Sequence, residues 1–244
     1  MYLEEIKKLR DDRDYYGEYG KQFLSNSDID TLINNPADFH KPSEDKIEYK
    51  FGRAFHELVM FGDSAHIQDV VEASTRTTKI YKDAIAEAGE MLFLQKEYDQ
   101  LMFLVDKFQS NKHVDELMLG KNVEYEVPIV GKLFSDEVLW KGKADVVNGD
   151  LIIDIKTTSN LKAFPKTVKP YNYDSQAFIY SRLFGKDFKF IAVDKNTGVI
   201  GIFDVSPYTL DDGEMKAGIA EDKYIEYFVK QTEDVQNHTI YGTV

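Results

Sequence analysis

Residues 142–156 read GKADVVNGDLIIDIK, and this stretch decides the fold that the sequence predicts. Two β-prone runs, 143–147 and 151–157, flank the dipeptide Asn148-Gly149. An Asn-Gly pair between two such runs is the strongest short-range hairpin signal, because both residues tolerate the positive φ angles of a two-residue type I′ turn. The stretch therefore predicts two antiparallel strands joined by a tight turn.

The length of this turn decides which side chains share a face of the hairpin. With Asn148-Gly149 as the two loop residues, Asp145 pairs with Ile152, and side chains alternate between the two faces. One face is then apolar and carries Ala144, Val146, Leu151, Ile153 and Ile155. The opposite face carries Asp145, Ile152, Asp154 and Lys156. A three-residue loop would change this parity, so the prediction depends on the turn.

The polar face of the hairpin has the chemistry of a metal centre. Asp145 and Asp154 become diagonal neighbours, roughly 7–8 Å apart at the backbone. Two carboxylates at this spacing can converge on a divalent cation, and oxygen ligands favour Mg²⁺ or Mn²⁺. Lys156 lies two residues along the same face, where it can orient or deprotonate a water. Such a centre polarises a phosphodiester and activates water for in-line attack.

The acidic-x-Lys triplet has no weight by itself in this chain, because six other such triplets occur. Only Asp154-Ile155-Lys156 ends an apolar strand that pairs with a second aspartate on the same face. The alternative for the hairpin taken alone is a solvated face with a cross-strand ion pair.

The chain changes character near Gly120. Before it, apolar periodicity predicts helices over 46–62 and 79–110, with an N-cap at Ser27-Asp28 opening a shorter helix. After it, alternation and composition predict strands over 123–129, 132–140, 188–194 and 199–205 beside the hairpin, a helix over 171–184 and a last helix from Ser206-Pro207 to about 230.

This order predicts an α/β (α+β) protein with a central mixed β-sheet flanked by helices and a helical N-terminal half. We expect one domain over residues 1–244. Its parts are a mainly helical segment (1–119), the catalytic sheet core (120–206), and a C-terminal helix and tail (207–244).

The charge distribution bears on nucleic-acid binding. A net charge of −13 argues against a surface that is basic throughout, which phosphate binding normally needs. Residues 141–190, however, hold nine Lys/Arg and five Asp, a net of +4, so the remainder carries −17. The basic region contains the polar hairpin face. A chance fluctuation in a highly charged chain is the alternative.

Several classes of protein are excluded by composition. The chain contains no cysteine, which rules out disulfides, thiolate nucleophiles and cysteine-ligated zinc or iron–sulfur sites. No run approaches the roughly 18 apolar residues that a membrane span needs. The first residues lack the basic-then-apolar pattern of a secretory signal. We therefore expect a cytoplasmic protein with no membrane partner.

Two helical motifs flank the hairpin in the sequence. His56 follows Gly52 by one helical turn, although a lone helical histidine is more often a packing or surface residue. Gln176 and Tyr180 share a helix face at positions i and i+4, which alone would be an ordinary polar edge.

Taken in order, these motifs resemble the RecB-like branch of the PD-(D/E)xK nuclease superfamily, and in particular the phage and prophage exonuclease VIII (RecE-type) nuclease domain. The family order is a Gly-x-x-x-His helix, a Gly-x-x-Asp strand, an acidic-x-Lys strand and a Gln-x-x-x-Tyr helix. The chain supplies Gly52/His56, Gly142/Asp145, Asp154/Lys156 and Gln176/Tyr180. The segments LSNSDI (24–29) and NPADF (35–39) also resemble the opening of that family, so the resemblance covers about residues 20–205.

The resemblance implies a restriction-endonuclease-like core and a role for each motif residue. One or two Mg²⁺ or Mn²⁺ ions would be held by His56, Asp145, Asp154 and the Ile155 carbonyl. Lys156 would be the catalytic lysine, and Gln176 and Tyr180 would position DNA or the attacking water. Related nucleases often carry a four-cysteine iron–sulfur cluster, which this chain cannot form without cysteine.

The activity implied is Mg²⁺-dependent exonucleolytic degradation of DNA, from the end of a duplex, in phage-type recombination or end processing. Such enzymes feed a single-strand annealing protein, and several assemble as homo-oligomers; a phage-encoded member acts in the host cytoplasm. Three alternatives remain open. They are a structure-specific endonuclease of the same fold, a catalytically silent nucleic-acid-binding or assembly module, and a non-catalytic helix–sheet domain.

Overall fold

The hairpin of β4 and β5 lies in the middle of a five-stranded mixed sheet. The computed structural model describes residues 2–42, 46–62, 70–120 and 122–240, and within them the sheet has the order β3-β4-β5-β6-β7. Its strands are β3 (Val123–Gly131), β4 (Trp140–Asn148), β5 (Leu151–Thr158), β6 (Asp187–Asp194) and β7 (Ile200–Asp204). β5 and β6 pair in parallel, whereas the other neighbouring pairs are antiparallel.

The parallel pair needs a crossover, because a tight turn can join only antiparallel strands. The segment between β5 and β6 supplies it with α8 (Phe164–Thr167) and α9 (Tyr173–Phe184). β5 and β6 are covered on both faces and accordingly carry apolar runs, Leu-Ile-Ile at 151–153 in β5 and Phe-Ile-Ala-Val at 190–193 in β6. The crossover helix α9 thereby comes to lie beside the hairpin.

The hairpin differs from the predicted one in register. Asn148 pairs with Leu151 and Val147 with Ile152, so Gly149 and Asp150 form the two-residue loop. Gly149 has a φ of 57° and Asn148 and Asp150 have none in the positive range, which is the pattern of a type II′ turn with glycine first. The predicted type I′ turn at Asn148-Gly149 is wrong, because Asn148 instead donates its side-chain amide to the carbonyls of Leu117 and Leu119.

Helices make up the described chain before β3. They are α1 (Leu3–Lys8), α2 (Asp12–Tyr16), α3 (Ile29–Asn34), α4 (Ile47–Phe61), α5 (Lys79–Ala88), α6 (Gln95–Gln109) and α7 (Lys112–Met118). The single helix predicted over 79–110 is wrong, because Gly89 ends α5 with a φ of 73°. The chain then forms β2 (Phe93–Leu94), which pairs with β1 (Val70–Val71) before α6 begins. Asp28 is the N-cap residue of α3, within the predicted Ser27-Asp28 pair, and Ser25 and Asp28 form a capping box on the 3-10 turn that precedes it.

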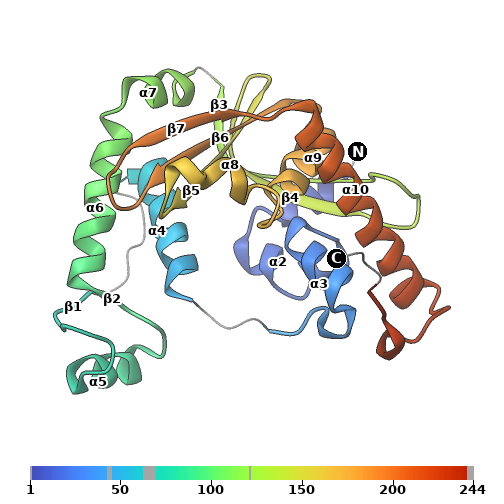
Figure 1. Ribbon diagram of the computed structural model, residues 1–244, viewed down its shortest axis with the longest axis horizontal. Helices are drawn as coiled ribbons and strands as arrows, with labels where there is room; N and C mark the ends of the chain where they lie inside the picture. Colours follow the sequence, from blue (N-terminus) through green and yellow to red (C-terminus); the bar gives the residue numbers. More distant parts are fainter. Residues whose placement is uncertain (1, 43–45, 63–69, 121, 241–244) are drawn as a thin grey trace.

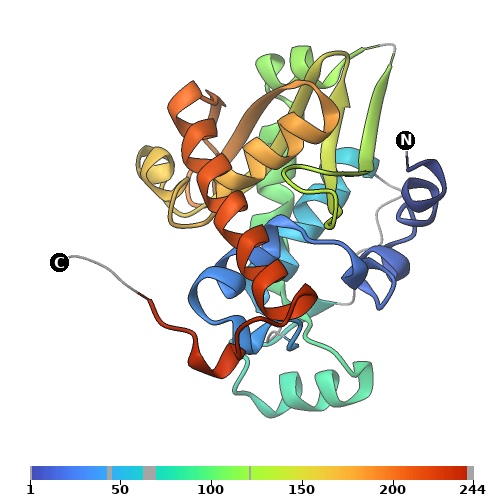
Figure 2. The ribbon, with the colours of Figure 1, turned by 90° about the vertical axis from the view of Figure 1, so that its right-hand side faces the viewer.

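The helices cover the two faces of the sheet as two groups (Figure 1 and Figure 2). On one face, α4 and α6 pack against apolar side chains of β4, β5 and β6, including Val146, Ile153 and Ile191. On the other face, α3, α9 and α10 (Pro207–Tyr224) enclose a second core that includes Trp140, Ile152 and Phe190. The apolar stripe predicted on residues 46–62 is the buried side of α4.

The segment between β3 and β4 is a loop rather than the strand predicted over 132–140. The buried carboxylate of Glu221 on α10 holds this loop in place. It accepts hydrogen bonds from the Ser135 amide at 2.8 Å and from Trp140 Nε1 at 2.6 Å. These bonds satisfy a backbone donor outside the sheet, so the segment follows α10 instead of pairing with a strand.

The helices and strands predicted from residue 171 onward agree with α9, β6, β7 and α10 of the structure. Ser206 caps α10 by accepting from the Thr209 amide, with Pro207 at the first helical position, and one π-helical turn continues the helix to Val229. The mixed α/β class with a central sheet between helices is confirmed. In the described residues, no helix combines the length and apolar character that crossing a membrane requires.

Candidate active site

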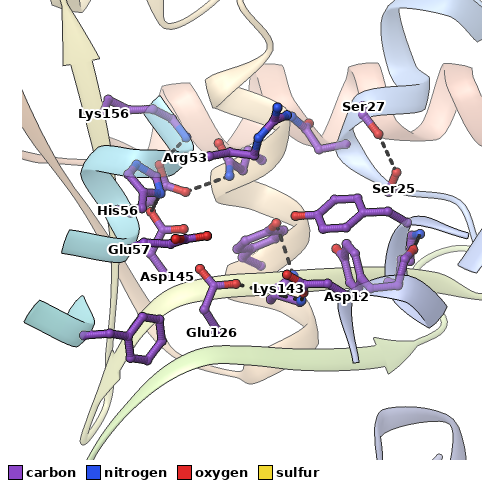
Figure 3. A pocket seen from close by; sticks show the side chains of 18 residues that line it. Asp12, Ser25, Ser27, Arg53, His56, Glu57, Glu126, Lys143, Asp145 and Lys156 are labelled. Atoms are coloured by element: carbon purple, nitrogen blue, oxygen red, sulfur yellow. Dashed lines mark hydrogen bonds and ion pairs between the residues drawn. The ribbon is translucent and has the colours of Figure 1, made fainter. Parts of the chain in front are cut away.

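A pocket of about 610 Å³ opens where β4 and β5 separate. Side chains from α2, α4, β3, β4, β5 and α9 line it, so it gathers segments that are far apart in the sequence. In Figure 3, His56, Asp145 and Lys156 lie together at one side of the pocket, and Asp12 and Lys143 lie at the other. The predicted residues His56, Asp145, Asp154, Lys156, Gln176 and Tyr180 all line this pocket.

Asp145 occupies the gap between the two strands. Backbone pairing of β4 with β5 stops at Val146 and Ile153, and beyond it Asp145 Oδ2 accepts the Ile155 amide at 2.7 Å. The carboxylate therefore replaces a backbone partner. When the register of the pairs from Val146↔Ile153 to the turn is continued, Asp145 and Asp154 come opposite one another rather than diagonal.

The predicted apolar face is wrong at one residue. Ala144 packs with Ile152 in the core under α9, whereas Val146 packs in the core under α4. Strict alternation would place Ala144 and Val146 together. The break coincides with Glu126 on β3, which has a φ of 51° and forms no backbone pair with Asp145. The strand pair is therefore distorted at the position where Asp145 enters the pocket.

His56 reaches Asp145 from the helix α4. Its Nδ1 lies 3.5 Å from Asp145 Oδ2. Burial alone would lower the pKa of His56, but the Asp145 carboxylate outweighs it and raises that pKa. Burial would likewise raise the pKa of Asp145, which His56, Lys156 and the Ile155 amide together bring below its usual range. The two side chains thus form a charge pair inside the pocket.

Asp154 is almost completely buried, with 1% of its surface exposed. Its Oδ2 accepts a hydrogen bond from Gln176 Nε2 at 2.7 Å, and its Oδ1 forms an ion pair with Lys156. Burial raises the pKa of Asp154 to about 6, and the nearby Asp145 charge adds to this. Gln176 therefore belongs to this site through its hydrogen bond to Asp154, which it donates from α9.

Lys156 is held in its charged form. Burial alone would lower its pKa, but the carboxylates of Asp154 and Asp145 raise it well above the ordinary value. The ammonium also lies 4.9 Å from the ring centre of Tyr173, a cation–π contact. In this arrangement the Lys156 ammonium can donate hydrogen bonds and stabilise negative charge.

The Tyr180 side chain is held in place by contacts with Gly142 and Lys143 on β4. The Tyr180 hydroxyl accepts a hydrogen bond from the Lys143 amide at 3.2 Å, and burial raises the pKa of Tyr180 to about 12. A Cβ atom on Gly142 would lie 2.7 Å from the Tyr180 ring, closer than real Cβ contacts come. The glycine of the Gly-x-x-Asp motif thus makes room for the tyrosine of the Gln-x-x-x-Tyr motif.

We expect Gly142→Ala to lower the free energy of unfolding by about 1–3 kcal/mol, the usual cost of overpacking a buried site. The matched control is Gly52→Ala, since a Cβ at Gly52 would meet nothing within 4 Å and alanine favours the interior of α4. Urea denaturation of both variants measures the difference. Equal stability of Gly142→Ala and wild type would show that the Tyr180 ring can move aside.

The donor set fits a hard divalent cation. Asp154 Oδ1 is buried and, apart from its ion pair, has no hydrogen-bond partner among the residues that the structure describes. A carboxylate oxygen with spare acceptor capacity therefore lies at the centre of the site. Within a strand the N–H and C=O of one residue point to the same side, so the Ile155 carbonyl faces Asp145, as its amide does. In the described residues, however, no three His, Asp or Glu side chains already converge as a metal cluster. Asp145 and Asp154 each pair with a cationic side chain there.

Glu126 is a pocket residue that the sequence analysis missed. It lies opposite Asp145 on β3, and its Oε2 is 3.9 Å from Lys143 Nζ, which also pairs with Asp12. Burial, together with the charge of Asp145, raises the pKa of Glu126 to about 7. The alternation of residues 123–129 placed Glu126 on the polar face of its strand, which was the available signal.

Comparisons with known proteins bear on the family and the fold of the chain. A family model described as a PDDEXK-like domain of unknown function matches residues 22–240. A crystal structure of a "Putative exonuclease" from Eubacterium rectale is similar, with a TM-score of 0.61 and 15% identity over 96% of this chain and 95% of that one. A phage-related exonuclease from Haemophilus somnus 129PT matches with 14% identity over 76% of this chain and 99% of that one, at the low TM-score of 0.32. None of the curated proteins compared with the chain matches it.

Proposed function

Because the chain belongs to the family of PDDEXK-like domains, we propose that it is a metal-dependent DNA exonuclease, an Mg²⁺-dependent deoxyribonuclease that hydrolyses phosphodiester bonds. One observation carries the proposal: a single pocket unites Asp145, Asp154 and Lys156 with His56 and Gln176. The designation of the similar Eubacterium rectale protein as a putative exonuclease supports the choice of exonucleolytic cleavage. The proposal takes residues 1–244 as one nuclease domain.

PDDEXK nucleases generally use divalent metals. In this chain Asp145, Asp154, His56 and the Ile155 carbonyl would hold one or two Mg²⁺ or Mn²⁺ ions. Such an ion supplies charge for the phosphate and lowers the pKa of bound water. Iron–sulfur chemistry is excluded by the absence of cysteine from the sequence.

The protein side chains divide the remaining work. Gln176 holds the Asp154 carboxylate by its Oδ2, which leaves Oδ1 directed to Lys156 and the pocket. The Lys156 ammonium stabilises negative charge that develops on the phosphate oxygens during attack. Tyr180, one turn along α9 from Gln176, fixes the β4 backbone next to Asp145 and positions the DNA strand through it.

The charged side chains of the pocket nearly balance one another. Five carboxylates line the pocket, against four Lys/Arg side chains and His56. The carboxylates are Asp12, Glu57, Glu126, Asp145 and Asp154, and the cations are Arg53, Lys141, Lys143 and Lys156. If His56 is counted as a cation, as its pairing with Asp145 favours, the two sets cancel, so bound divalent ions would supply the net positive charge that favours a polyanion.

The experiment that tests the proposal compares linear duplex DNA with closed circular DNA at equal concentration in Mg²⁺. We expect the linear form to be degraded from its ends and the circle to persist. Equal nicking of both forms would instead indicate endonucleolytic cleavage, and a forked or flapped duplex would then test for a structure-specific endonuclease. Digestion of neither would leave a nucleic-acid-binding module. The recombination setting, a single-strand annealing partner and a homo-oligomeric state belong to the same proposal.

His56 provides a separate prediction. We expect His56→Ala to weaken metal affinity by about 10–100-fold, the effect of losing a group that orients or ligates a metal. Activity should then require a higher Mg²⁺ concentration and recover partly at saturation. A titration of the cleavage rate against Mg²⁺ measures this, with the exposed His113 on α7 as the control (His113→Ala). An unchanged Mg²⁺ requirement in His56→Ala would assign His56 to packing.

A further inference from the structure

Two large aromatic side chains of the active-site pocket remain exposed. Tyr16 at the end of α2 is 68% exposed, and Phe61 at the end of α4 is 43% exposed. Both line the pocket that contains Asp145 and Asp154. Large aromatic side chains usually contribute to a core, so two that present free ring surface within one polar pocket suggest a ligand with flat, apolar faces.

Both rings are held in place by contacts that leave ring surface free. Tyr16 packs edge-on against Tyr15, with ring centres 4.9 Å apart, and Tyr15 is itself only 6% exposed in a buried cluster. Phe61 packs edge-on against Tyr125, with ring centres 6.0 Å apart. The two rings come from different helices, so they contribute two separate platforms to the pocket wall.

Charge alone does not explain what these platforms bind. Lys143 Nζ, which lies 5.4 Å from the Tyr16 ring centre, is already paired with Asp12 and lies near Glu126. Its charge is therefore largely compensated. A ligand in this part of the pocket gains more from ring stacking than from a further ion pair.

We propose that Tyr16 and Phe61 stack the bases of unpaired nucleotides next to the scissile phosphate, so that the pocket accepts a single strand in preference to a closed duplex. This inference rests on the proposed nuclease function. Every nucleobase has a π face, so stacking of this kind tolerates any sequence. In a duplex those faces are already stacked on neighbouring bases, whereas an unpaired end presents them freely.

The test measures binding by fluorescence anisotropy, in Mg²⁺ and in a Lys156→Ala background so that the probe is not consumed. The probes are a single-stranded oligonucleotide of mixed sequence and a fully abasic strand with the same phosphates. We expect the base-bearing strand to bind more tightly than the abasic one. Tyr16→Ala and Phe61→Ala should each weaken binding of the base-bearing strand by about 10-fold and leave binding of the abasic strand unchanged, since stacking is worth roughly 1–3 kcal/mol per base.

Two controls separate stacking from other effects. Tyr16→Phe keeps the ring and should bind as the parent does. Tyr208→Ala removes a ring that is 83% exposed on α10 outside the pocket and should also have no effect. Equal loss for both probes, or no loss for either, would overturn the inference. If the wild-type protein still degrades linear DNA in that case, only the stacking role fails. If it neither cleaves nor binds DNA, the proposed function fails as well.

Discussion

Replacing Lys156 with alanine is expected to reduce DNA cleavage by about 10²–10⁴-fold, the range for losing a group that acts on the transition state through charge or proton transfer. The Lys156 ammonium is paired with Asp154 and keeps its positive charge, so alanine removes a fixed charge from the reacting centre. The initial rate of nucleotide release from linear duplex DNA measures the effect. Circular dichroism checks that the variant remains folded, since Asp154 loses its ion pair.

The control for this variant lies on the adjacent strand. Lys189 ends the same kind of acidic-x-Lys triplet, on β6, but pairs with Asp204 away from the pocket. Lys189→Ala should therefore keep activity within about twofold of wild type, as a surface substitution does. A wild-type rate in a folded Lys156→Ala variant would remove Lys156 from the mechanism.

Asp154→Asn is expected to abolish cleavage and, independently, the stabilisation of the protein by divalent ions. Binding of Mg²⁺ or Mn²⁺ to wild type at about 100 times its dissociation constant should add roughly 2.7 kcal/mol. For a chain of this size that raises Tm by about 5–10 °C. The amide of asparagine can still accept the Gln176 bond but carries no charge for the ion, so the variant should show no such shift. Thermal unfolding with and without metal measures it.

Asp194→Asn is the matched control, because Asp194 is another buried aspartate at the end of a central strand. Its carboxylate accepts the amides of Leu161, Asn196 and Thr197 and holds a loop, and it does not line the pocket. We expect a lower Tm in every buffer and an unchanged shift with metal. If Asp154→Asn gained the same stabilisation as wild type, Asp154 would not be a metal ligand.

The hairpin was predictable because its information is local. Two apolar runs and Asn148-Gly149 were enough to place Asp145, Asp154 and Lys156 toward one pocket. The turn moved by one residue because Asn148 bonds to the end of α7, which no local rule contains. This change moves the pairing by one residue on each strand. Asp145 and Asp154 therefore still point to the same side of the hairpin.

The approach of the helices was not derivable from spacing. His56 and Gln176 reach Asp145 and Asp154 only because α4 and α9 lie against the separated strands. Periodicity predicts that each helix exists and which side is apolar, but not where the helix sits along the sheet. The motif order of a known family provided that placement.

Glu126 shows the other limit of the sequence. Its entry into the pocket depends on a φ of 51°, a conformation that is uncommon for any residue with a side chain. It also depends on the register between β3 and β4, which are joined by the long loop anchored on Glu221. Neither the strained backbone at Glu126 nor the loop has a local sequence signal. The strand over 132–140 was wrongly predicted for the same reason, because nothing in the local sequence marks this segment as a loop.

A crystal soaked in Mn²⁺ tests the central claim most directly, namely that this pocket is a metal-dependent nuclease centre. Anomalous scattering at the manganese edge locates the ion without reference to activity. We predict a peak in contact with the carboxylates of Asp145 and Asp154 and next to the Ile155 carbonyl, with the Lys156 ammonium displaced from Asp154 Oδ1. A map without manganese between these two aspartates, from crystals soaked at a concentration that supports cleavage in solution, would contradict it.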